Sequence, residues 1–268
     1  MERKLFCEIS PLTYKISVTR LRWKRRIADW RSSAVFAKEK QQEKLPILVF
    51  SHESVIRRKL GNVNMELQNN KAVNLGIAAP KVNMVLIKPG EIFSFWQLVG
   101  STGVRKGYRE GLQIANGKTS AGVGGGMCQF TNLIHWMVLH TPLQIVEHHH
   151  HDRYDLFPDC NRTVPFGTGT SVFYNYLDYR FYNPTNITFQ LVIYTTDEYL
   201  CGELRSDREL QNSYDIQVEG EKFMKEKDGI YRCGEVYRTI TSRESGEVVA
   251  KELLRKNHAL VMYEMDLS

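Results

Sequence analysis

A single apolar stripe in the middle of the chain constrains the fold most. Its members, spaced i, i+3, i+4, i+7 and i+8, are Phe130, Leu133, Ile134, Met137 and Val138. This spacing predicts a helix that packs one face on a hydrophobic core. Thr141-Pro142 ends the helix, because proline lacks the N–H that a continuing helix needs.

The segments around this helix predict an α+β fold. Residues before Pro80 follow a helical rhythm, with a helix expected to open at Ser51 or Glu53 and to end at Pro80. The segments 85–100, 143–151 and 170–204 are strand-like, with a further strand around Gln113 to Ala115. The last fifty residues favour antiparallel hairpins, with turns at Asp228-Gly229 and Ser245-Gly246. Because helices come first and strands follow, rather than alternating, the order favours α+β over repeated βαβ units.

Three regions are expected along the chain. Residues 1–53 form a basic helical region, residues 54–205 a central mixed domain with a buried helix packed on an antiparallel sheet, and residues 206–268 a β-rich extension. A chain of 268 residues is long enough to bury such a core.

The net charge of +6 gathers near the N-terminus, in "KISVTRLRWKRRIADWR", where Trp23 and Trp30 are interleaved with the cations. This pattern is typical of a solvated helix that caps a domain or of a helix that contacts an anionic membrane surface. No nucleic-acid signature accompanies it, so no nucleic-acid partner is expected.

Cysteine usage and hydropathy bear on location. Five cysteines, odd in number and without a CxxC pair, do not form a disulfide framework or a paired-cysteine zinc site. No apolar run is long enough for a signal peptide or a spanning helix. We therefore expect a cytoplasmic protein, peripheral to the membrane if the basic segment contacts lipid.

The stretch "GVGGGMCQF", residues 122–130, places glycines directly before the buried helix. It lacks the Lys-Ser/Thr of a phosphate-binding P-loop. Cys128 is expected in the first helical turn, where the helix dipole favours a thiolate. His135 lies seven residues further, about 10 Å along the helix, too far to act as its base.

A partner for Cys128 is expected from the strand that follows. The chain order Cys128, then His149 or His151, then Asn175 or Asp178 matches a cysteine nucleophile, its base and an orienting group. The backbone N–H of Cys128 and the side chain of Gln129 could form an oxyanion site.

Two other interpretations remain open. Cys128 can be a small buried hydrophobic residue, as a lone cysteine usually is. No cofactor is expected unless the tract His148 to His151 binds zinc with Asp152, Asp155 or Asp159. The loop after the histidines offers Asp159, Asn161 and Arg162 to a ligand or to its own turn. Asn69, Asn70 and Lys71 are expected at the surface.

Four stretches of the sequence resemble the VanW family over about residues 54–200: "KPGEIFSFWQLVG", "RKGYREG", "GVGGGMCQFTN" and "FPDCNRTVPFGTGTSVFYNYLDYRFYN". The resemblance implies an association with glycopeptide resistance and the bacterial envelope. The matching site positions are Gly124, Gly125, Gly126, Cys128, Gln129, His151, Asp159, Asn161 and Arg162.

The resemblance predicts a resistance-accessory protein that acts on or binds a cell-wall peptide or precursor. A Cys128–His151 pair would perform acyl transfer or hydrolysis. A non-catalytic module that binds a peptide or glycan is the alternative, and a histidine metal site is the third.

Overall fold

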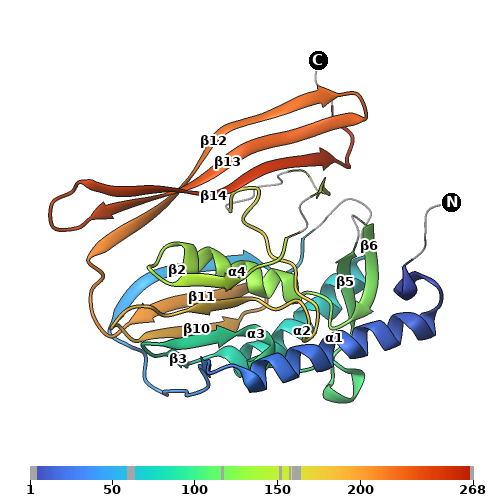
Figure 1. Cartoon of the computed structure of the whole chain (residues 1–268), viewed down its shortest axis with the longest axis horizontal. Coiled ribbons are helices and arrows are strands. Elements are labelled where there is room, and N and C mark those ends of the chain that lie inside the picture. The colour runs from blue at the N-terminus through green and yellow to red at the C-terminus, as the bar shows by residue number, and fades with distance from the viewer. Residues whose placement is uncertain are drawn as a thin grey trace.

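The computed structural model describes residues 5–58, 64–115, 118–150, 153–156, 158 and 164–265, with side chains 114, 115, 118 and 119 left out. It confirms an α+β fold with a strand-rich C-terminus (Figure 1). The described strands form three sheets of four strands each and a separate two-stranded hairpin.

The central sheet carries the predicted buried helix. Its strands, in spatial order, are β2 (Ile47–Val55), β11 (Tyr199–Ser206), β10 (Phe189–Thr195) and β3 (Val85–Ile87), and all pairs are antiparallel. Helix α4 (Met127–Leu139) contacts β2 and β11 and buries the expected stripe. Gly202 permits this approach, because a Cβ there would lie 2.7 Å from Met137 Cε.

Two expectations for the first eighty residues are wrong. The helix expected from Ser51 or Glu53 is strand β2, because this segment pairs with β11 far along the chain. Helix α2 (Met65–Val82) continues through Pro80, which falls in its last turn. Its carbonyl oxygen accepts a hydrogen bond from Lys40 Nζ (2.6 Å).

A second sheet lies beside the first. It orders β1 (Val35–Phe36), β4 (Glu91–Ser94), β9 (Arg180–Tyr182) and β7 (Gln144–Glu147), and β1–β4 is its one parallel pair. The short helices α3 (Phe95–Val99) and η2 (Val104–Lys106) follow β4 in the chain. Strand β7 ends where the histidine tract begins, so this sheet positions the histidines.

A glycine-rich hairpin leads into α4. It consists of β5 (Glu110–Ala115), which contains the strand expected around Gln113, and β6 (Lys118–Val123). The hairpin packs against α2. The start of α4 therefore lies between this hairpin and α2.

The C-terminal strands form a third sheet, drawn above the rest in Figure 1. Long strands β12 (Asn212–Glu226), β13 (Gly229–Ser242) and β14 (Val248–Val261) join through the two predicted turns. Short β8 (Tyr154–Asp155) pairs in parallel with β14. The C-terminal hairpins are thus confirmed.

The first helices lie along one side of the molecule (Figure 1). They are η1 (Phe6–Glu8) and α1 (Pro11–Arg31), and no side chain of either is fully buried. Within the described residues, no helix is long and apolar enough to cross a membrane. The three proposed regions remain predictions, and β2 runs across the first boundary.

Candidate functional site

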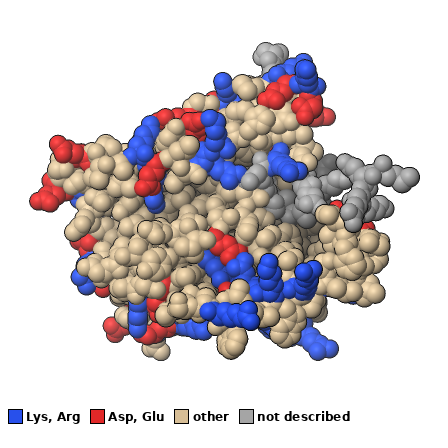
Figure 2. Space-filling model, viewed as in Figure 1, with Lys and Arg blue, Asp and Glu red and all other residues tan. Residues whose placement is uncertain are grey.

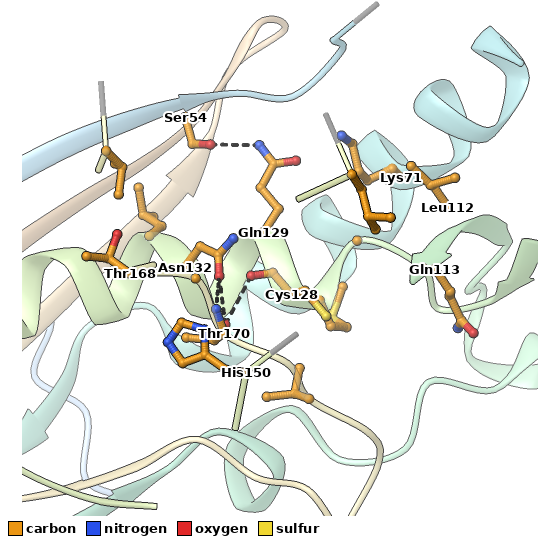
Figure 3. A pocket seen from close by; sticks show the side chains of 18 of the residues that line it. Ser54, Lys71, Leu112, Gln113, Cys128, Gln129, Asn132, His150, Thr168 and Thr170 are labelled. Atoms are coloured by element: carbon orange, nitrogen blue, oxygen red, sulfur yellow. Dashed lines mark hydrogen bonds between the residues drawn. The ribbon is translucent and has the colours of Figure 1, made fainter. Parts of the chain in front are cut away.

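A cavity of about 370 Å³ opens at the start of α4. Its walls come from α2, β2, the glycine-rich hairpin, the segment 164–174 and β14. The predicted positions Gly124, Gly125, Gly126, Cys128 and Gln129 all line it. Figure 3 shows Cys128 and Gln129 among the lining side chains. The fold therefore brings these neighbours in sequence to one surface.

The glycines before α4 are required by close contacts. Gly124 and Gly126 have φ angles of +81° and +108°, and a Cβ at Gly125 would overlap the carbonyl carbon of Gly111. Buried Asn74, on α2, donates to Gly125 O (2.9 Å) and accepts from Arg109 N (2.8 Å). One amide thus holds the loop and the hairpin together.

Cys128 is the second residue of α4, as expected, and is half-buried. Burial raises the pKa of its thiol above the ordinary value, and a backbone hydrogen bond with Val172 offsets this only in part. Among the described residues no hydrogen bond joins its sulfur to a histidine ring. In Figure 3 the sulfur points away from His150. These features describe a neutral thiol in the cavity wall.

The described histidines separate into two directions. His149 Nε2 contacts Glu147 Oε1 (2.9 Å), and His149 is not among the described residues that line the cavity. The rings of His148 and His150 meet edge to face with centroids 4.4 Å apart, and the ring of His148 lies tilted against that of buried His135 (4.3 Å). His150 lines the cavity. Sequence alternation separates His149 from its neighbours correctly, but the cavity receives His150.

Asp178 lies away from the cavity. It is buried, and its carboxylate accepts from Ser94 Oγ (2.6 Å), Trp96 N (3.0 Å) and Arg180 Nε (2.7 Å). Burial raises its pKa, and these hydrogen bonds oppose the rise. Among the described residues, no hydrogen bond or ion pair joins the Asp178 carboxylate to a histidine or to Cys128. Asn175 has a φ of 58° in its turn and does not line the cavity either.

Gln129 is held by β2. Its Nε2 donates to Ser54 Oγ and to Val55 O, both at 2.8 Å (Figure 3). Both N–H groups of the Gln129 side-chain amide are therefore engaged and are not available to an oxyanion. The amide oxygen of Gln129 remains.

Four of the expected site residues lie outside the described part of the chain: His151, Asp159, Asn161 and Arg162. The Cys128–His151 pair consequently stays a prediction. Asp152 also lies outside it. Within the described residues no group of three or more His, Cys, Asp or Glu side chains could hold a metal ion.

Lys71 is the residue that the sequence places wrongly. It is buried, with 6% of its surface exposed, and lines the cavity. Desolvation, together with the positive charges of Arg58 and Arg57, lowers its pKa to about 7. Its chain lies over Gly126, where a Cβ would be 2.5 Å from Lys71 Cγ. No local pattern in the sequence marks this burial, because it depends on contacts such as the one with Gly126, 55 residues further along the chain.

Polar groups on α4 shape the opposite wall. Asn132 Oδ1 accepts from Thr170 N (2.6 Å) and from Thr170 Oγ1 (2.8 Å). Thr131 also bonds the Thr170 hydroxyl. These bonds fix the segment 164–174 against α4. Figure 3 shows His150 and Lys71 to either side of Cys128.

Comparison with known proteins agrees with these features. A family model described as "VanW like protein" matches residues 70–205. The chain is 34% identical over 224 residues to the vancomycin B-type resistance protein VanW of Enterococcus faecalis, an alignment that covers 84% of this chain and 81% of that protein.

A shorter likeness is to the uncharacterized protein YoaR of Bacillus subtilis, 33% identical over 117 residues, 44% of this chain and 37% of YoaR. No solved structure matches the chain significantly. The matched residues include the loop, Lys71 and α4 that build the cavity. The chain belongs to the VanW family.

Proposed function

We propose that this protein is an accessory protein of glycopeptide resistance that binds the carboxylate end of a cell-wall peptide or precursor in the cavity. The resistance role is supported by the similarity to the Enterococcus protein, whose name states vancomycin B-type resistance. The observation that best supports ligand binding is the position of the Lys71 amine, which lies beside the start of α4.

Lys71 and the first turn of α4 together suit an anion. Within the described part of the chain, no hydrogen bond or ion pair engages the Lys71 amine, although the residue is more than nine-tenths buried. The first N–H groups of a helix lack intrahelical partners and carry partial positive charge. A carboxylate placed here receives both, and the nearby charge of Arg58 adds to the attraction.

The ligand's charge should also change the protonation of Lys71. An anion beside the amine favours its protonated form, so the pKa rises from about 7 toward the ordinary 10.5. Binding above neutral pH therefore takes up a proton.

Calorimetric titration tests this proposal directly. A muramyl pentapeptide with a free C-terminal carboxylate is compared with the same peptide bearing a C-terminal amide, in two buffers of different ionisation enthalpy. We expect roughly ten- to hundredfold tighter binding of the free carboxylate, with proton uptake near pH 8. Lys71→Met should remove both effects, while Lys225→Met, at an exposed position on β12, should keep them.

Equal affinity of wild type and Lys71→Met for the free acid would contradict the proposal. Covalent catalysis by Cys128 is a second candidate function, because Cys128 lines the same cavity. The Cys128 thiol would attack a peptide carbonyl, forming a thioester while the amide bond breaks and the amine leaves with the thiol proton. The acyl adduct would be visible by mass spectrometry and absent in Cys128→Ser. The binding function instead predicts unchanged affinity in Cys128→Ser.

A further inference from the structure

Helix α1 turns a set of hydrogen-bonded and ion-paired residues toward the protein and a stripe of large apolar residues toward solvent. Arg25 forms two bonds to Glu147, both 2.6 Å, and Asp29 is paired with Arg180 at 2.7 and 2.9 Å. Arg22 Nε donates to Tyr174 O (3.2 Å). These contacts fix which face of the helix points inward.

The outward face is apolar. Leu12, Ile16, Trp23, Ile27 and Trp30 lie within about one sixth of a turn of one another on the helix. Their exposed fractions are 67, 48, 58, 45 and 82%. These large apolar side chains form one exposed stripe, opposite the ion-paired face of the helix. An exposed apolar stripe of this kind indicates a binding surface for a partner or a membrane.

Exposed cations flank this apolar stripe. They are Lys15, Arg20, Lys24, Arg26 and Arg31. The one acidic residue of α1 is Asp29, which faces inward and is neutralised. Figure 2 shows Lys and Arg gathered along the lower edge, where Figure 1 draws α1, with uncharged atoms between them. The covering surface must therefore combine negative charge with an apolar interior.

We infer that α1 docks on an anionic lipid membrane, lying in the plane of the interface. The stripe enters the boundary between headgroups and acyl chains, and the flanking cations contact lipid phosphates. A nucleic acid would use the cations but would leave Leu12, Ile16 and Ile27 in water. The inference does not depend on the ligand proposed for the cavity.

Docking by α1 also places the cavity close to the lipid. A second hollow beside α1, of about 430 Å³, is lined by Arg26 and Trp30 from the helix. Trp96 and Tyr174 line both hollows. A substrate anchored in the membrane would thus meet the cavity next to the surface on which the protein rests.

Vesicle binding by the full chain tests the inference. The protein is mixed with phosphatidylcholine vesicles and with vesicles that also contain phosphatidylglycerol, with and without added salt. We expect binding to the anionic vesicles, weakened by salt, and much weaker binding to the neutral ones. Trp96 and Trp136 are buried. Quenching of tryptophan by brominated lipids will therefore report on Trp23 and Trp30.

Matched variants separate charge from apolar contact. Arg20→Glu with Lys24→Glu should weaken anionic binding by roughly 25-fold or more. Lys225→Glu with Lys227→Glu, an equal charge change on the C-terminal hairpin, should have far less effect. Ile27→Ser with Trp30→Ser should cost about tenfold or more. Val248→Ser with Val249→Ser, at equally exposed apolar positions on β14, should cost nothing.

All substituted residues are exposed, so circular dichroism melting should stay unchanged and loss of binding will not reflect unfolding. Equal binding by the α1 variants and their controls would overturn the inference. So would salt-sensitive binding to RNA without binding to anionic vesicles, or self-association that the Ile27 and Trp30 substitutions abolish in the absence of vesicle binding.

Discussion

At the scale of single residues, Lys71 is kept at a cost in stability. Folding removes much of the water around its amine, and this desolvation, with two nearby arginines, disfavours its charge. Its alkyl chain packs over Gly126. A side chain at position 126 would overlap this alkyl chain and displace it. A group that weakens the fold yet lines a cavity is better explained by ligand binding than by packing.

Lys71→Met should therefore stabilise the protein at pH 7, by about 1–3 kcal/mol, because methionine fills similar volume without a charge. Above pH 7 the folded state has released the Lys71 proton, while the unfolded chain keeps it up to about 10.5. Wild-type stability thus rises with pH between these values, and the advantage of Lys71→Met shrinks.

Urea unfolding of both proteins at several pH values from 7 to 10 measures this effect. Lys225→Met, at an exposed position, provides the control and should show no such convergence. A stability difference between wild type and Lys71→Met that stays constant with pH would show that Lys71 keeps its ordinary titration.

At the scale of elements, α1 is fixed to the core by ion pairs rather than by apolar packing. Glu147 receives Arg25 from the helix, His149 from its own segment and Asp178 N from the loop. Burial alone would raise its pKa, but these hydrogen bonds outweigh burial and lower it below 4.5. Because the charged form is stabilised by folding, this contribution exists above pH 4.5 and is lost as pH falls through the lowered value.

Acid should accordingly loosen α1 early. Hydrogen exchange of α1 amides, corrected for the intrinsic effect of pH, should accelerate below about pH 4.5 in the wild type. Glu147→Gln should show faster exchange already at pH 7, corresponding to a loss of about 1–3 kcal/mol. Glu39→Gln removes an exposed pair with Lys88 and should leave α1 protected. Protection of α1 that is identical in Glu147→Gln and wild type would contradict this role.

At the scale of the whole molecule, the C-terminal sheet closes one side of the cavity. Asp155 on β8 accepts from Tyr263 Oη (3.0 Å) and pairs with Arg232. From β14, Asn257 Nδ2 donates to Phe166 O (3.1 Å), and its side chain lies so close to Gly167 that a Cβ there would overlap it. The sheet thus holds the segment 164–174 in place.

Asn257→Ala should weaken binding of the free-acid peptide by roughly three- to tenfold, because losing one hydrogen bond of about 1 kcal/mol frees the Phe166–Gly167 segment. The unfolding midpoint should change little. Titration calorimetry measures the affinity, with Gln217→Ala on the exposed face of β12 as control. Unchanged affinity would mean that the sheet does not support the bound state.

Much of the fold follows from local patterns. The stripe from Phe130 to Val138 predicts α4 because helical periodicity is local, and the Asp228-Gly229 turn marks the β12–β13 hairpin for the same reason. Local patterns do not predict strand β2. Its partner β11 lies about 150 residues away, and only pairing turns "PILVFSHESV" into a strand.

The candidate site was predictable to a smaller extent. Residues 124–129 are adjacent in sequence, so the glycine loop and α4 bring them together wherever the chain folds. Lys71, Asn132 and Thr170 come from separate segments, and no spacing shows that they share a cavity. Asp178 resembles an orienting carboxylate in the sequence, but its geometry makes it a cap for the backbone of α3.

The contact between Gly111 and Gly125 has a consequence for how ligand preference can change in evolution. Two backbones meet there without side chains, so a substitution at Gly125 forces the main chains apart, and one at Gly111 presses on the Gly125 carbonyl. The floor of the cavity is in this sense fixed. Changes in preference are expected instead in its roof, residues 164–174 and β14, where side chains can be exchanged one at a time without disturbing the start of α4.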